Sequence, residues 1–136
     1  MRTIPSSSEL IEIVVSFLRE GTADANAFQF QVAANAIAIV GREIEIAPAA
    51  DAAARSRLRL LLGIDGTAED LERALAREIA DGRVTATTAG VLDHLWKSTL
   101  AELSIDQPGY ATYRRFVSIK EASLMTAPLA TGPRPS

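Results

Sequence analysis

The sequence predicts an all-α fold, a helical bundle of five to six helices around a central buried helix at about residues 26–46. Apolar residues make up 48% of the chain and charged residues 23%, which are the proportions of a globular protein. Aromatic residues are only 5%, so small and aliphatic residues must fill the core, and alanine favours closely spaced helices. Helix-capping residues and apolar residues at helical spacing recur along the chain.

The central segment, "NAFQFQVAANAIAIVGREIEIAP" over residues 26–48, has two interpretations. "IAIV" and "EIEI" alternate like two strands joined by a turn at Gly41 and Arg42. Helical spacing also fits, since Phe30, Ala33, Ile37, Val40 and Ile44 form one apolar row and Val32, Ala36, Ile39 and Ile46 form a second. The alanines favour the helix, in which Gly41 costs about 1 kcal/mol against alanine. We therefore expect one helix with both rows buried and the row of Gln31, Asn35, Ala38, Arg42 and Glu45 facing outward.

The first three helices that flank this segment are predicted from their caps and stops. Ser6 and Glu9 have capping-box spacing, which starts a helix that Gly21 ends. Pro48 is expected to end the central helix and to begin another, which Gly63 closes. Its inner stripe is Ala50, Ala54, Leu58, Leu61 and Leu62. Thr67 caps a narrow, peripheral helix.

The rest of the chain is predicted to add one or two helices and a tail. A cap at Thr87 or Thr88 starts a helix that ends near Ile105, because Gln107 precedes a proline. Its inward residues are expected to be Leu92, Leu95, Trp96, Thr99, Leu100 and Leu103. Residues 110–125 have a weaker helical stripe, and the Pro-rich residues 126–136 are expected to be a flexible tail. Residues 5–125 are thus predicted to form a single helical-bundle domain.

Composition argues against several classes of partner and compartment. The net charge of −3 argues against a nucleic-acid footprint, which is normally basic. No apolar run reaches the length of a membrane span, so we expect no membrane partner. The chain has no cysteine, hence no disulfide framework or thiolate metal site, and a reducing cytoplasm is the expected location.

Motifs for catalysis or cofactor binding are weak in this sequence. His94 is the only histidine, and a lone histidine beside a carboxylate is more often hydrogen-bonded than a metal ligand. No Gly-rich phosphate loop and no nucleophile motif is present. We expect no cofactor, no metal and no catalytic residue, and a non-enzymatic role is favoured over an enzymatic one. Arg55, Arg57 and Arg59 are interpreted as a solvated basic face.

Polar residues within the central helix form the candidate site. Asn35 lies in an apolar stretch and Glu43 interrupts an apolar row, so both would need partners if buried. Arg42 is one possible partner, and His94 and Asp106 complete the candidate set. Two interpretations stay open: a structural network that joins helices, and a polar pocket in the bundle core that binds a small metabolite.

Two motifs carry a family resemblance. "VAANAIAIVGRE" (Val32–Glu43) and "KSTLAELSIDQPGY" (Lys97–Tyr110) resemble an uncharacterised bacterial domain family of small alanine-rich helical proteins. Gln107 stands where the family usually has asparagine. The resemblance covers about residues 5–110 and implies occurrence beside or fused to aminoglycoside-phosphotransferase-like kinases, and near acyl-CoA dehydrogenases. It implies an accessory partner of such an enzyme and no activity.

The sequence thus favours a helical protein-interaction domain, with a metabolite-binding domain as the alternative. We expect a homodimer or a complex with a partner enzyme, because a thin bundle with few aromatics leaves apolar surface uncovered. The expected interface anchors are Tyr110, Tyr113 and Phe116.

Overall fold

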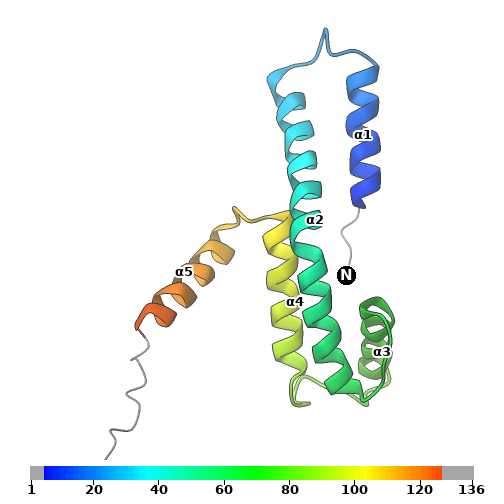
Figure 1. The fold of residues 1–136 in the computed structure, drawn as a ribbon, viewed down its shortest axis with the longest axis vertical. Coiled ribbons are helices and arrows are strands. Elements are labelled where there is room, and N and C mark those ends of the chain that lie inside the picture. The colour runs from blue at the N-terminus through cyan, green and yellow to red at the C-terminus, as the bar shows by residue number, and fades with distance from the viewer. Residues whose placement is uncertain (1–4, 127–136) are drawn as a thin grey trace, which may run out of the picture.

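The computed structural model describes residues 5–126, which form helices joined by turns and contain no strand. The helices are α1 (Ser7–Arg19), α2 (Ala27–Leu62), α3 (Ala68–Ala80), α4 (Val91–Asp106) and α5 (Ala111–Thr126). Figure 1 shows α2 as a long spine, with α1 beside its N-terminal half and α3 and α4 beside its C-terminal half. The predicted all-α fold is confirmed, and no hairpin interrupts α2.

The predicted break at Pro48 is wrong, because α2 continues through this residue for a total of 36 residues. A proline inside a helix removes one backbone hydrogen bond and costs about 3 kcal/mol. Pro48 and Ile44, whose carbonyl loses its donor, both lie on an exposed turn where water can replace that donor. Helices pack against α2 on both sides of Pro48 and favour its continuity: α1 lies before it, α3 after it, and α4 spans it through contacts with Arg42 and Arg57.

The main core lies between α3 and the C-terminal half of α2. Leu58 is fully buried and contacts Leu71 and Leu75 of α3, and Leu62 and Val84 pack against this cluster. The predicted inner stripe of this half is confirmed, with Ala54 and Leu58 buried and Leu61 and Leu62 half-buried. Thr67 caps α3 as predicted, since its hydroxyl accepts a hydrogen bond from the Asp70 N–H.

The N-terminal half of α2 and helix α1 form a two-helix hairpin. We call residues 7–46 the α1/α2 hairpin. The capping box of Ser6 and Glu9 starts α1 as predicted. Few side chains of this hairpin are buried, chiefly Val14 and Val40. The expectation that two apolar rows of α2 are buried is wrong, because Phe30, Val32, Ile37 and Ile44 are 45–72% exposed. Helix α2 is therefore central in the fold and still exposes apolar rows in its N-terminal half.

Helix α4 begins later and faces α2 differently from the prediction. Its N-cap is Gly90 in the left-handed region (φ 86°), not Thr87 or Thr88. The residues that face inward are Val91, His94 and Ile105, whereas the predicted Leu92, Leu95 and Trp96 are 43–60% exposed. Hydrogen bonds from Arg42 and Arg57 of α2 join this side of α4 to α2. The predicted end before Gln107 is confirmed.

Helix α5 extends away from the other helices (Figure 1). Residues 111–126 are helical, which the weak apolar stripe left open. The predicted tail over 126–136 lies outside the described residues, apart from Thr126, which ends α5. Phe116 of α5 packs edge-on against Trp96 of α4, with ring centroids 5.1 Å apart.

Candidate functional site

A polar seam joins α2 to α4, and two arginines of α2 form its contacts. The Arg42 Nε donates a hydrogen bond of 2.6 Å to the carbonyl oxygen of Ile105. The Arg57 Nε donates to Nδ1 of His94 at 3.3 Å, and its Nη2 donates to the Ser98 hydroxyl at 3.5 Å. Because a higher residue number on α2 meets a lower one on α4, the two helices are antiparallel. The seam fixes which side of α4 faces α2.

His94 is the most deeply buried polar residue of the described chain, with 2% of its surface exposed. Burial lowers the pKa of its imidazole, and the nearby Arg57 guanidinium lowers it further, which outweighs the opposite effect of Glu72 and Asp93. A neutral imidazole is also what the geometry needs, because Nδ1 accepts the hydrogen bond from Arg57. Glu102, half-buried on the same helix, has its carboxyl pKa raised chiefly by burial.

The other predicted polar residues do not gather at one place. Glu43 is half-buried and accepts a hydrogen bond from the Ser7 hydroxyl, which ties α1 to α2. Asn35 is exposed, as its place in the outward-facing row predicts, and its amide oxygen accepts from Gln31 on the same helix at 3.1 Å, so it does not belong to a buried network. A helix rises about 1.5 Å per residue, which puts Asn35 about 33 Å along α2 from Arg57, the partner of His94. These residues therefore do not line a common pocket.

Asp106 lies at the last residue of α4, half-buried and next to the Ile105 carbonyl that Arg42 binds. Of the predicted set, the structure therefore brings Arg42 and Asp106 to the same end of the seam. His94 lies on the seam farther along α4, at the contact with Arg57. The sequence interpretation placed Arg57 on a solvated basic face and missed this role. The sequence signal for this role was the spacing: Arg57 lies two residues from both Arg55 and Arg59, and residues two apart point to different sides of a helix.

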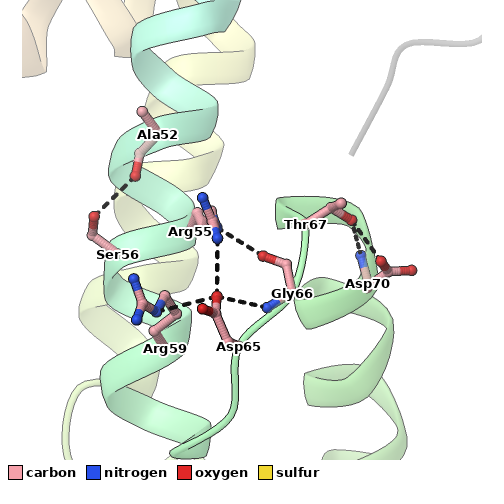
Figure 2. A network of polar contacts seen from close by, with 8 residues as sticks. All are labelled: Ala52, Arg55, Ser56, Arg59, Asp65, Gly66, Thr67 and Asp70. Atoms are coloured by element: carbon pink, nitrogen blue, oxygen red, sulfur yellow. Dashed lines mark hydrogen bonds and ion pairs between the residues drawn. The ribbon is translucent and has the colours of Figure 1, made fainter.

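A second polar network holds the turn between α2 and α3 (Figure 2). Arg55 donates to the Gly66 carbonyl at 2.7 Å and to the Asp65 carboxylate at 2.9 Å, and Arg59 lies 3.3 Å from the same carboxylate. The hydrogen bond from Arg55, followed by that from the Gly66 N–H, lowers the pKa of Asp65. A hollow of about 770 Å³ beside this network is lined by several carboxylates, and its one arginine, Arg55, is already engaged. The network explains the turn and offers no free cation to an anionic ligand.

The predicted interface aromatics lie at the start and middle of α5. Tyr110 is 50% exposed just before the helix. Tyr113 is half-buried, and Phe116 is half-buried against Trp96. An interface at these residues stays a prediction.

The most extensive apolar surface lies instead on the two sides of the α1/α2 hairpin. On one side, Ile13, Phe28 and Val32 are 51–74% exposed and border a groove of about 240 Å³. Its lining is almost entirely apolar and is completed by Val14, Phe17, Gln29, Ala33 and Ala36. On the opposite flank of each helix lie two exposed rows: Ile11, Val15 and Leu18 of α1, and Phe30, Ile37 and Ile44 of α2.

Gly41 lies within the same exposed flank of α2. A Cβ atom placed on it would meet nothing within 4 Å, so the single chain has room for alanine there. A glycine in a helix interior costs about 0.5–1 kcal/mol relative to alanine. The described chain therefore contains no packing reason for the glycine at this position.

Comparison with known proteins identifies the family. A family model described as a domain of unknown function (DUF6285) matches residues 20–110. The chain belongs to this family. The match spans both motifs that suggested an uncharacterised helical family, residues 32–43 and 97–110, and confirms that resemblance at the level of a domain of unknown function. No curated protein and no solved structure matches the chain.

Clusters of metal-binding side chains and membrane-spanning helices are both absent from residues 5–126. Residues 5–126 contain no group of three or more histidine, cysteine, aspartate or glutamate side chains that could hold a metal ion. Within the same residues, none of the helices combines the length and the apolar character needed to cross a membrane.

Proposed function

We propose that this chain is a non-enzymatic protein-interaction domain, and that its α1/α2 hairpin is the element on which another protein docks. The observation that carries the proposal is the exposure of large apolar side chains on both flanks of this hairpin, up to 74% at Phe28 and 72% at Ile44. Soluble monomers rarely expose contiguous apolar patches beyond a few hundred Å². Covering one such side chain contributes about 1.5–3 kcal/mol, so a partner protein would be held mainly by apolar contacts.

The family resemblance supports accessory partners for this domain: an aminoglycoside-phosphotransferase-like kinase or an acyl-CoA dehydrogenase-like enzyme. Under this proposal the polar seam between α2 and α4 has a structural role. Arg42 and Arg57 join the helices and thereby hold the hairpin at a fixed angle to the rest of the chain.

The alternative, a small-metabolite-binding domain, has less support from the geometry. It would need Asn35, Glu43 and His94 to converge, whereas Asn35 is exposed and far along α2 from the partner of His94. The groove of the hairpin is lined by one polar residue, Gln29, and suits an apolar side chain better than a polar metabolite.

Photo-crosslinking in the native cell tests the proposal. A photoreactive phenylalanine analogue replaces Phe28 or Ile37 on the hairpin, and replaces Glu69 on the exposed face of α3 as the matched control. We expect discrete crosslinked protein adducts from positions 28 or 37 and none from position 69. Well-folded chains that give no adduct from either hairpin position would contradict the proposal. Mass spectrometry of the adducts separates a copy of this chain from a kinase-like or dehydrogenase-like partner.

A further inference from the structure

One flank of α2 alternates large and small side chains over four helical turns. The large residues are Phe30, Ile37 and Ile44, spaced by seven, which keeps them on one side of the helix. Ala34 and Gly41 lie between them, and all of these positions are exposed. We call this set of five residues the large-small face. Large residues alternating with small ones are the pattern by which the side chains of two helices interdigitate.

Gly41 leaves room in this face for the close approach of another helix, and no other part of residues 5–126 fills that room. Glycine is favoured where another backbone approaches closely, and nothing in the described chain lies within 4 Å of a Cβ at this position. A second helix lying across the face would supply that neighbour.

The charge of the face favours a second copy of this chain over a charged partner. From residue 27 to residue 41, α2 carries no charged side chain, although most of these residues are exposed. A two-fold dimer places the same patch against itself, so any net charge in the patch would be repelled by its own copy. An uncharged patch avoids this repulsion.

The face is also symmetric in the way that a two-fold contact requires. Ile37 lies midway between Phe30 and Ile44, so two antiparallel copies would place Ile37 against Ile37, and Phe30 against Ile44. The row of Ile11, Val15 and Leu18 on α1 adds to the same side of the hairpin. A fully exposed large apolar residue has an accessible surface on the order of 200 Å². At their exposed fractions, the three large residues of the face and the three of α1 together present about 600 Å² of accessible surface per copy. Two copies bury about 1,200 Å², the lower end of the range for specific interfaces.

We propose that the chain forms a two-fold homodimer in which the large-small face of α2 packs antiparallel against the same face of a second copy. The two hairpins then form a four-helix arrangement with Ile37 at the two-fold axis and Gly41 about one helical turn from it, where the small residue leaves room for a side chain of the second copy. This rests on the proposed function, since it names the protein that docks on one side of the hairpin. The groove on the other side is left for a different partner.

Light scattering behind a sizing column tests the dimer on the full chain at micromolar concentrations. We expect twice the 14.5 kDa of one chain, and a monomer for Ile37→Glu and for Gly41→Leu. Leu60→Glu is the matched control, because Leu60 lies on the same helix, is 88% exposed and is outside the face. It should stay dimeric. A monomeric wild-type chain, or a dimer that Tyr110→Glu dissociates and Ile37→Glu does not, would overturn the proposal.

Two further variants keep the test decisive if a charged variant fails to fold. Gly41→Ala should raise the helix stability of the isolated chain while weakening the dimer at least about tenfold, two changes of opposite sign. The chain has no cysteine, so Ile37→Cys introduces a single thiol at the proposed axis, and oxidation should yield a disulfide-linked dimer. Leu60→Cys under the same conditions should not. Equal crosslinking of both variants, or of neither, contradicts the dimer, whereas photo-crosslinks from position 37 to another protein would sustain the proposed function alone.

Discussion

The two halves of α2 belong to one continuous helix and yet differ sharply in how they are packed. The C-terminal half lies between α3 and α4 and buries Ala54 and Leu58, while the N-terminal half packs mainly against α1, meets the end of α4 at Arg42, and buries only Val40. One neighbouring helix covers one stripe of a helix surface, and two neighbours cover a wide arc. An apolar row is therefore buried only if the fold supplies a helix to cover it, and residues 5–126 supply no such helix for the exposed rows of the hairpin.

The largest change in stability is expected from truncation of a buried leucine in the C-terminal half of α2. Leu58→Ala removes a fully buried side chain from the cluster with Leu71 and Leu75 and should lower the free energy of unfolding by about 2–5 kcal/mol. Leu60→Ala, two positions away and 88% exposed, should change it by less than about 0.5 kcal/mol. Chemical denaturation of both variants measures the contrast. Similar values would mean that the core does not lie between α2 and α3.

A second test compares two glycines with positive φ in turns outside α2: Gly21 precedes its N-terminal half, and Gly90 starts a helix that packs against its C-terminal half. Gly90 (φ 86°) starts α4, and a Cβ there would lie 2.9 Å from a methyl group of Leu61. Gly21 (φ 95°) follows α1, and its Cβ would meet nothing within 4 Å. Gly21→Ala should cost about 1–2 kcal/mol of backbone strain alone, and Gly90→Ala should cost more because the Leu61 side chain must also move. Thermal unfolding of the two variants would contradict this account if Gly21→Ala were the more destabilised.

A third test uses pH, because a buried histidine, His94 of α4, packs against Arg57 in the C-terminal half of α2. The folded-state pKa of His94 is lowered from its ordinary value of 6.5, so the unfolded chain binds this proton more readily than the folded chain. The free energy of unfolding should therefore fall as the pH drops below about 6.5, and should be independent of His94 above it. Denaturation of the wild type and of His94→Gln from pH 8 to pH 5 measures the effect. The variant should show a flatter profile, and parallel profiles would exclude His94 as the cause.

The smallest expected effects come from exposed polar residues of the two halves. Asn35 is exposed and accepts a hydrogen bond from Gln31 of the same helix, so Asn35→Ala should change stability by less than about 0.5 kcal/mol. Arg55 holds both Asp65 and the Gly66 carbonyl, so Arg55→Ala should cost up to about 1 kcal/mol, since its contacts are largely exposed. This order reverses what the sequence suggested, which was a buried Asn35 and a solvated Arg55. A larger effect at Asn35 in chemical denaturation would place it in an interface.

The positions of the helices could be predicted well because their signals are local. The capping box at Ser6 and Glu9, the cap at Thr67 and the stop before Gln107 each act through neighbouring backbone groups, and all are found in the structure. The alanine-rich segment likewise forms a helix rather than a hairpin. Two local signals were misread. Pro48 does not end α2, because helices pack against α2 on both sides of it, and α4 is capped by Gly90 instead of Thr87 or Thr88.

The candidate site could be predicted only in part. Arg42 was singled out as a partner of Glu43, and it bonds to the Ile105 carbonyl of another helix instead. His94 was expected to lie on the helix surface or to be hydrogen-bonded. It accepts a hydrogen bond from Arg57 and is buried, and both depend on which side of α4 faces α2. An apolar stripe on α4 suggested the side with Leu92 and Leu95. In the structure Arg42 and Arg57 of α2 instead contact the side of α4 that carries His94 and the Ile105 carbonyl.

The sequence by itself determined the fold class, most helix boundaries and the presence of more apolar surface than one small bundle needs. These follow from the spacing of residues three, four and seven apart, which is a property of each helix alone. Only the tertiary structure decided which apolar rows are covered. The rows of the N-terminal half of α2 are as apolar as those of a buried helix, but α3 packs beside the C-terminal half, and α4 meets the N-terminal half only with its last turn, where Ile105 contacts Arg42. Burial depends on where neighbouring helices lie, and no spacing within one helix specifies that position.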